Sequence, residues 1–227
     1  MAEIKGILID LDNTLYDYER CHKVALIYLV EFLSSRSEID KKTLHVCYQQ
    51  VREEIHHELK VVASMHNRLL YLQRLAERLD HQLIPHVLEG YYLYWDVYIK
   101  HIVLFDGVKE FLDKNKDKKI AFVTDLTADV QHKKLLHLNL WPVTTALVTS
   151  EEAGCEKPDE RIFRLALKKL YLKPAQVCMI GDDYQKDIVG ATKLGIKSYW
   201  FNPGAQKVKP HPLVTEFKDF KKLLECL

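Results

Sequence analysis

The sequence lacks the features that mark membrane, secreted and nucleic-acid-binding proteins. No apolar run reaches the roughly 18 residues of a membrane span, and residues 1–5 lead into an apolar run without a signal-peptide pattern. The formal charge of +1 provides no basic surplus for nucleic acid or an anionic membrane. The five cysteines form no CxxC pair, which favours reduced thiols. We therefore expect a cytoplasmic protein without a nucleic-acid or membrane partner.

Residues 15–102 have few helix breakers and no convincing strand. Residues 15–100 contain one proline, Pro85, and one glycine, Gly90. Apolar residues recur there at spacings of three and four, the period of an amphipathic helix. The pattern predicts helices over residues 24–33, 43–59, 63–79 and 84–99. Four such helices are enough for a small bundle, with Ile27, Leu29 and Leu33 in its core.

Short apolar runs of β type alternate with helical stretches in the rest of the chain. The predicted strands are residues 4–9, 119–124, 145–149, 176–181 and 196–201. Predicted helices follow at residues 107–116, 128–138, 159–171 and 185–194, with a closing amphipathic helix at 216–227. This alternation is typical of a parallel sheet covered on both faces. We expect an α/β fold, with a Rossmann-like doubly wound core of residues 1–14 and 103–227 and an inserted α-helical domain of residues 15–102.

Polar residues gather where these predicted strands end. In a doubly wound sheet the carboxyl ends of the strands meet at one edge, where ligands bind. The candidates at this edge are Asp10 and Asp12 after the first strand, Thr124 and Asp125 at the second, Lys157 beyond the third, and Asp182, Asp183 and Asp187 at the fourth. Neighbouring carboxylates repel each other, so a divalent cation or a lysine must balance them. We therefore expect one shared pocket.

Phosphoryl transfer is the chemistry that suits this set of residues. The Asp10 carboxylate can attack phosphorus and form an aspartyl phosphate, and Asp12 can act as the general acid and base. Mg²⁺ prefers oxygen ligands, which Asp10 and Asp182 offer. The ammonium of Lys157 and the hydroxyl of Thr124 would hold the phosphoryl oxygens.

The four segments resemble the haloacid dehalogenase-like hydrolase superfamily, in its phosphatase branch with a helical cap between the first and second motifs. The motifs are Asp10-x-Asp12-x-Thr14, Thr124, Lys157-Pro158, and Gly181-Asp182-Asp183-x-x-x-Asp187, in the order that the superfamily has them. The spelling DLDNTLYD is similar to that of nucleotide and sugar-phosphate phosphatases of the superfamily. The joint match is far more specific than any single motif.

The resemblance implies a role for each matching residue. Asp10 is implied to be the nucleophile, and Asp12 the acid/base that also binds Mg²⁺ through its backbone carbonyl. Asp182 would bind Mg²⁺ directly, with Asp187 supporting it from behind. Thr14 would hydrogen-bond the turn behind the nucleophile, and Asp183 would cap the following helix.

Asp125 departs from the superfamily pattern, because many relatives carry asparagine after the hydroxyl residue. Another carboxylate beside a phosphate would weaken binding unless it turns away or accepts a hydrogen bond from a donor. We expect only the backbone N–H of Asp125 to face the phosphoryl group.

Two further patterns in the helical segment favour ordinary packing. Its histidines lack metal-binding spacing: His45, His56, His57, His66, His81, His86 and His101. Tyr91, Tyr94, Trp95 and Tyr98 share one helical face, which predicts a bundle core; the alternative places one of these rings or Tyr16 over the leaving group.

The sequence therefore predicts a Mg²⁺-dependent phosphatase that hydrolyses a small phosphomonoester, either a nucleoside monophosphate or a sugar phosphate. The cap would close over the site and select the leaving group. A sugar-phosphate mutase of the same fold is the first alternative, and a catalytically silent binding or regulatory module is the second. C–halogen hydrolysis needs no acid/base at Asp12, so the paired acids count against it. The oligomeric state stays open.

Overall fold

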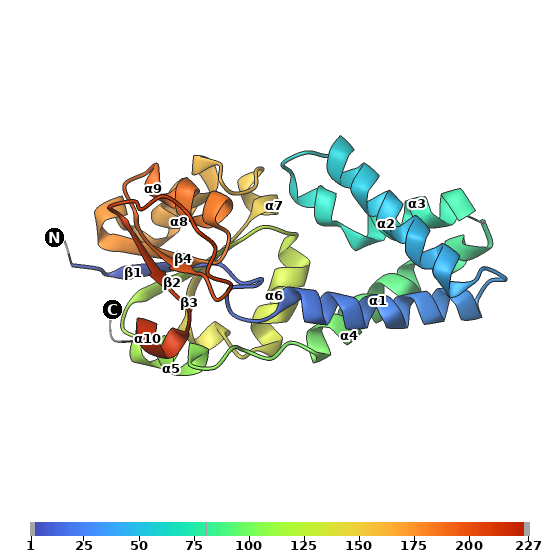
Figure 1. Cartoon of the computed structure of the whole chain (residues 1–227), viewed down its shortest axis with the longest axis horizontal. Coiled ribbons are helices and arrows are strands. Elements are labelled where there is room, and N and C mark those ends of the chain that lie inside the picture. The colour runs from blue at the N-terminus through green and yellow to red at the C-terminus, as the bar shows by residue number, and fades with distance from the viewer. Residues whose placement is uncertain (1–2, 80, 225–227) are drawn as a thin grey trace. The chain divides into compact units, whose positions relative to one another are not determined.

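The computed structural model describes residues 3–79 and 81–224, and the chain divides into two compact units (Figure 1). One unit comprises Met1–Asp17 and Val103–Leu227, and the other comprises Tyr18–Ile102. The first contains a sheet with helices and the second contains helices only. The role of the helical unit as a cap stays a prediction.

The first unit is built on a six-stranded sheet in the order β3-β2-β1-β4-β5-β6, with every neighbouring pair parallel. The strands are β1 Gly6–Ile9, β2 Lys119–Thr124, β3 Thr144–Thr149, β4 Val177–Gly181, β5 Lys197–Phe201 and β6 Val214–Phe217. The chain moves from β1 through β2 to β3 on one side, and then crosses to β4 on the other side of β1. The strand order therefore reverses between β1 and β4, which is where open α/β sheets bind their ligands.

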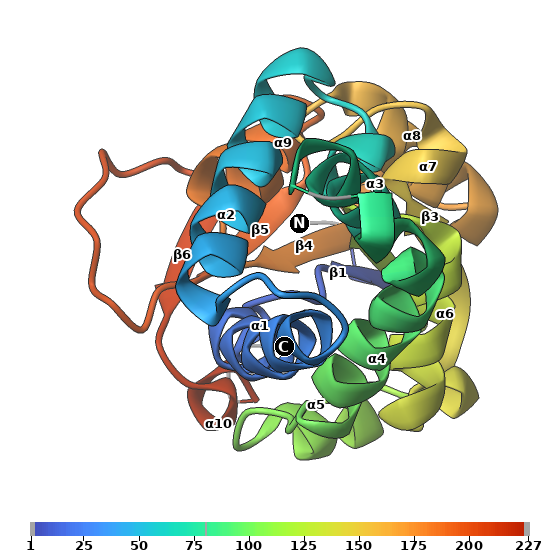
Figure 2. The same cartoon turned by 90° about the vertical axis from the view of Figure 1, so that its right-hand side faces the viewer.

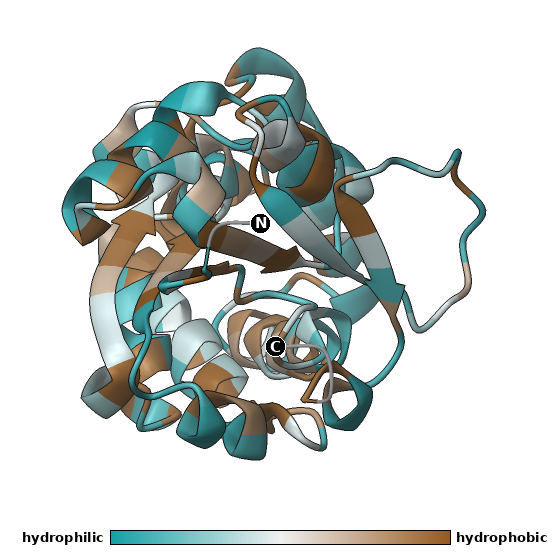
Figure 3. Ribbon diagram, turned by 90° about the vertical axis from the view of Figure 1, so that its left-hand side faces the viewer, coloured by the Kyte–Doolittle hydropathy of each residue, from teal (hydrophilic) through white to brown (hydrophobic). Residues whose placement is uncertain are grey.

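Helices cover both faces of this sheet (Figure 2). They are α5 Val108–Lys114, α6 Ala128–His137, α7 Ser150–Ala153, α8 Glu160–Leu170, α9 Gly190–Thr192 and α10 Phe220–Leu223. On one face Phe163 and Ala166 of α8 pack with Leu8, Val123 and Met179 of the strands in one buried cluster. Helices α5 and α10 lie on the opposite face. The central strands are hydrophobic along their length (Figure 3), as expected for a sheet buried on both sides. The predicted Rossmann-like α/β class is confirmed.

The prediction of a closing helix over residues 216–227 is wrong about where the helix begins. Residues 214–217 instead form the edge strand β6, in which Val214 pairs with Ser198 and Phe217 with Phe201. The helix there is only α10, which begins after Asp219, whose carboxylate accepts a hydrogen bond from the Lys221 N–H at 2.7 Å. Residues 225–227 lie outside the described residues. A four-residue strand leaves too short a periodic pattern to be recognised, because its stability comes from pairing with β5.

The second unit consists of α1 Tyr18–Ser35, α2 Lys41–Glu58, α3 Arg68–Leu79 and α4 Val87–Lys100. One helix was expected over residues 63–79, but the structure interrupts it at Asn67. The 3-10 helix Ala63–His66 comes first, and the Asn67 side chain then accepts a hydrogen bond from the Leu69 N–H at 2.9 Å. The 3-10 helix His81–His86 contains Pro85, so α4 begins only at Val87.

Close packing between α1 and α4 depends on Gly90. A Cβ there would lie 3.1 Å from Cδ1 of Leu29, so the missing side chain lets this leucine approach the α4 backbone. Leu29 and Leu33 are buried as expected, but Ile27 is 59% exposed, and its assignment to the core is wrong. Ile27 lies one position beyond the buried stripe of Leu26, Leu29, Val30 and Leu33.

The aromatic face of α4 is confirmed as packing for three of its four members. Tyr94, Trp95 and Tyr98 are buried, and Tyr91 is half-buried. Among residues 3–79 and 81–224, no helix is both long enough and apolar enough to cross a membrane.

Candidate active site

Asp10 leaves the end of β1 beside the end of β4. Its N–H donates to the Ile180 carbonyl at 3.0 Å, which extends the pairing of the two strands by one residue. The side chain is 7% exposed. The hydroxyl oxygen of Thr14 lies 3.1 Å from Asp10 Oδ2 and 3.0 Å from Asp182 Oδ1, and it accepts the Asp182 N–H at 3.0 Å. Thr14 thus holds the ends of β1 and β4 together.

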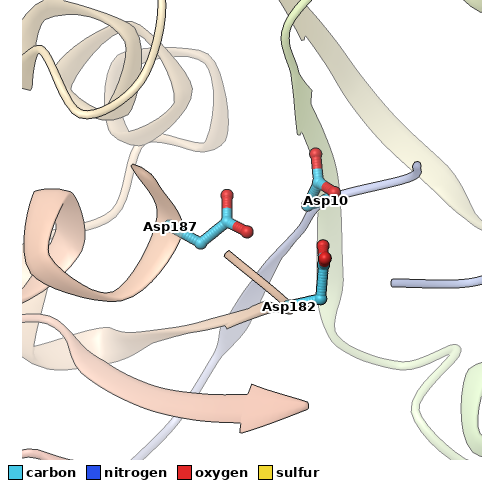
Figure 4. A group of neighbouring side chains, drawn as sticks. All are labelled: Asp10, Asp182 and Asp187. Carbon is cyan, nitrogen blue, oxygen red and sulfur yellow. The ribbon is translucent and has the colours of Figure 1, made fainter. Parts of the chain in front are cut away.

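Three carboxylates converge at this switch point (Figure 4). One oxygen each from Asp10, Asp182 and Asp187 lies within 4.8 Å of the other two. Among residues 3–79 and 81–224, no other group of three or more histidine, cysteine or acidic side chains converges in this way. The predicted meeting of distant acids at one edge is therefore seen for these three residues.

Gly181 makes room for this arrangement. A Cβ at this position would lie 2.3 Å from Oδ2 of Asp187, far inside van der Waals contact. The same oxygen of Asp187 accepts the Asp183 N–H at 3.1 Å. Asp183 begins the π-helical segment Tyr184–Val189, and its carboxylate accepts the N–H groups of Gln185 and Lys186 at 2.9 Å each. Asp183 therefore caps the following helix, as expected.

Among the described residues, Lys157 is the only lysine whose ammonium contacts this carboxylate cluster. Its Nζ lies 2.5 Å from Asp10 Oδ1 and 2.7 Å from Asp187 Oδ1, and donates to the Val123 carbonyl at 3.2 Å. Burial opposes the charge of Lys157, but Asp10 and Asp187 outweigh it and raise the pKa of the ammonium well above its usual value. Lys157 is therefore a fixed positive charge at physiological pH.

The charges in this cluster do not balance. Three carboxylates against one ammonium leave two negative charges if every group is ionised. Burial, and then repulsion from Asp10, raises the pKa of Asp182 to about 7. Burial likewise raises the pKa of Asp10 and Asp187, although Lys157 opposes both shifts. A divalent cation would remove this imbalance, and an all-oxygen donor set is the kind that Mg²⁺ and Ca²⁺ prefer.

The carboxylate of Asp12 has different partners. Lys134 Nζ lies 2.7 Å from its Oδ1 and 2.9 Å from its Oδ2, and the Tyr16 hydroxyl donates to Oδ1. Lys134 is fully buried, whereas the side chain of Asp12 is 21% exposed. This pairing keeps the Asp12 carboxylate in one orientation.

Thr124 and Asp125 close β2 with their side chains engaged. Gln131 Nε2 donates to the Thr124 hydroxyl at 2.7 Å and to the Asp125 carbonyl at 3.1 Å. The Asp125 carboxylate accepts the Lys157 N–H at 3.0 Å and pairs with Lys186 Nζ at 3.0 Å. Donors therefore satisfy this extra acid, and its carboxylate fixes the backbone of Lys157. That only the backbone N–H of Asp125 faces the phosphoryl group stays a prediction.

Three polar residues that contact the predicted site residues were not predicted from the sequence: Gln131, Lys134 and Lys186. A signal existed for two of them. Gln131 and Lys134 lie on the same face of α6 as the buried Val130 and Leu135. Polar residues on the apolar face of a helix require buried partners, so this pattern predicts a polar contact beneath α6. Lys186 carries no comparable signal.

The profile of the haloacid dehalogenase-like hydrolase family matches residues 7–201. A ribulose-1,5-bisphosphate 5-phosphatase from Halopiger xanaduensis is 32% identical over 207 residues, which cover 88% of this chain and 86% of that protein. A glyceraldehyde 3-phosphate phosphatase from Pyrococcus furiosus is 28% identical over 223 residues, which cover 97% and 88%.

Solved structures share the fold at lower identity. A phosphatase of this superfamily from Thermococcus onnurineus has a TM-score of 0.76 at 20% identity, covering 98% of this chain and 97% of its own. A magnesium-bound hydrolase from Bacillus subtilis has a TM-score of 0.73 at 19% identity, covering 99% of each chain. The named phosphatases among the relatives support a phosphoric monoester hydrolase, and the prediction of an enzyme of this family is confirmed. The chain belongs to the haloacid dehalogenase-like hydrolases.

Proposed function

We propose that this protein is a Mg²⁺-dependent phosphatase that hydrolyses a small phosphomonoester through an aspartyl phosphate on Asp10. The observation that carries the proposal is the convergence of Asp10, Asp182 and Asp187 around Lys157 at the switch point of the sheet. The names of the relatives support a sugar phosphate rather than a nucleoside monophosphate. A cytoplasmic location stays part of the proposal.

The first half of the reaction forms the covalent intermediate. A carboxylate oxygen of Asp10 attacks phosphorus, and the bond from phosphorus to the leaving oxygen breaks. Asp12 gives its proton to that oxygen, so the product leaves as an alcohol. Three groups hold the phosphoryl oxygens during this step and stabilise their negative charge. They are the hydroxyl of Thr124, the ammonium of Lys157 and the backbone N–H of Asp125.

The second half returns the enzyme to its starting state. Water attacks the phosphorus of the aspartyl phosphate, Asp12 takes the proton of this water, and inorganic phosphate leaves while the Asp10 carboxylate is restored. Asp10, Asp182 and the backbone carbonyl of Asp12 would hold Mg²⁺, which when bound would supply positive charge to the phosphoryl oxygens. Thr14, Asp183 and Asp187 keep these groups in position.

The test is a phosphomonoester panel assayed for inorganic phosphate with Mg²⁺ and with excess chelator. We expect hydrolysis that the chelator abolishes and Mg²⁺ restores. Asp10→Asn removes the nucleophile and should lower turnover by roughly 10⁴-fold or more, with no phosphoryl group trapped after an acid quench. Asp129→Asn is the matched control, because Asp129 is an exposed residue that pairs, among the described residues, only with Lys133.

Each contrary result removes a different part of the proposal. A normal rate for Asp10→Asn would rule out covalent catalysis by Asp10. Full activity in chelator would rule out the cation. Transfer of the phosphoryl group to a second position of a sugar, without release of phosphate, would identify a mutase instead.

A further inference from the structure

The helical unit buries an arginine among aromatic rings. Arg68, the first residue of α3, is 1% exposed. Its guanidinium carbon lies 5.4–6.0 Å from the ring centroids of four aromatic residues: Tyr18, Tyr71, Tyr94 and Trp95. Nη1 donates to the His66 carbonyl at 2.7 Å and Nη2 donates to the Tyr18 hydroxyl. The buried Nε of Arg68 has no hydrogen-bond acceptor among the described residues.

No acid within residues 3–79 and 81–224 forms an ion pair with Arg68. The other arginines of α3 differ: Arg74 pairs with Glu58 at 2.6 Å and Arg78 with Glu54 at 2.5 Å. A guanidinium cannot lose its proton in a protein, and buried charges are normally paired. The groups that raise the pKa of the Arg68 guanidinium are phenols. Burial raises the pKa of one of them, Tyr94, well above its usual value, so this phenol stays neutral and does not balance the charge.

A second unpaired donor lies on the other side of Tyr71, whose ring centroid is 5.5 Å from the Arg68 guanidinium carbon and 5.9 Å from that of Tyr48. The hydroxyl of Tyr48, a residue 1% exposed, has no hydrogen-bond partner among the described residues. Arg52 lies one helical turn after Tyr48 on α2, and no described acid pairs with it. The charges of Arg68 and Arg52 both act on Tyr48 and on His22. Burial, and then the charge of Arg68, lowers the pKa of His22 to about 3, so His22 adds no charge.

We propose that the helical unit binds a small oxyanion, a carboxylate or phosphate group, through the guanidinium of Arg68 and the hydroxyl of Tyr48. The unsatisfied Nε–H and O–H are donors, and an oxyanion accepts such bonds while supplying the missing negative charge. Arg52 adds positive charge to the same surroundings. The oxyanion is a separate small anion that the helical unit holds by itself.

The experiment observes Arg68 directly. Protein labelled with ¹⁵N at arginine is titrated with sodium sulfate and sodium acetate, and sodium chloride at equal ionic strength is the reference. The Nε–H signal of Arg68, identified by its loss in Arg68→Lys, should shift downfield and saturate with one of the two oxyanions. Signals of Arg78, which is already paired with Glu54, should not shift. Tyr48→Phe should weaken the binding by about 10-fold.

Saturable shifts of the Arg68 signal that Tyr48→Phe weakens are the expected result. If neither oxyanion shifts this signal beyond the sodium chloride reference, the proposal is wrong. The titration uses the unmodified sequence, so it decides the matter even if Tyr48→Phe does not fold.

Discussion

The two units of this chain bury charge of opposite sign. At the sheet switch point of the first unit, three carboxylates share one ammonium. In the helical unit, Arg68 is buried without an acidic partner among the described residues. The whole chain nevertheless has a formal charge of only +1. Net charge therefore conceals two local imbalances that only the folded arrangement reveals.

This difference matters because burying an unbalanced charge costs free energy that packing must offset. A ligand of opposite charge removes that cost, so an uncompensated buried charge indicates where a ligand binds. The first unit should attract a cation and a phosphoryl group, and the helical unit an oxyanion. The other buried groups of the helical unit are mostly apolar and aromatic, and their contribution is packing.

The sharpest test of this contrast is Asp12→Asn in the first unit. Loss of the general acid and base should lower kcat by about 10²–10⁴-fold, equivalent to roughly 3–5 kcal/mol of activation free energy. The free energy of unfolding should change by much less, since asparagine keeps the shape of the side chain. Steady-state kinetics and urea denaturation measure the two effects. An unchanged kcat would remove Asp12 from the chemistry.

Leu29→Ala in the helical unit should show the reverse pattern. Leu29 is fully buried and packs against Gly90 of α4, so its loss leaves a cavity. We expect the free energy of unfolding to fall by about 2–5 kcal/mol, as measured by urea denaturation. Ile27→Ala is the control on the same helix, because Ile27 is 59% exposed, and it should change the stability by less than about 0.5 kcal/mol. Equal losses for both would contradict the packing of α1.

Lys134→Met tests whether the first unit depends on buried charge for stability as well as for chemistry. Without Lys134 the Asp12 carboxylate loses its cation, and we expect a loss of about 1–3 kcal/mol in the free energy of unfolding. Combining Lys134→Met with Asp12→Asn should recover part of this loss. Lys133→Met is the control, since the one ion pair of Lys133 within the described part of the chain is an exposed pair with Asp129. A double variant whose losses simply add would show that the two residues are not coupled.

The pH dependence of the helical unit should give the smallest effect. The pKa of His22 is about 3 in the folded protein, against 6.5 for an unperturbed histidine. The unfolded chain binds the proton more readily, so this contribution is complete above pH 6.5 and is lost as the pH falls toward 3. Between pH 7 and 5.5 the loss is about 1 kcal/mol. Hydrogen exchange of α1 peptides measures it, and His22→Gln should remove it. A slope that persists in His22→Gln would assign the effect to another group.

The sequence located most elements because local periodicity decided them. The strand β2 was predicted with the same bounds, and α6 within one residue of its end. The errors arose where a distant partner or a single side chain decided. Strand β6 is held by β5, and α3 begins only after the Asn67 side chain has capped it.

The candidate site divides in the same way. Motif spacing indicated which carboxylates and which lysine belong together. It placed Asp187 behind Asp182, but it did not indicate that Lys157 pairs with Asp187 or that Asp125 holds the backbone of Lys157. Lys134 was missed because its partner Asp12 lies 122 positions away.

The sequence by itself determined the α/β class, the inserted helices and the candidate residues at the edge of the sheet, because hydrophobic period and motif order are local properties. Only the tertiary structure decided which charges have partners. A charge is balanced or unbalanced according to what lies within a few ångströms of it in space, and for Lys134 and Arg68 those neighbours come from other segments of the chain.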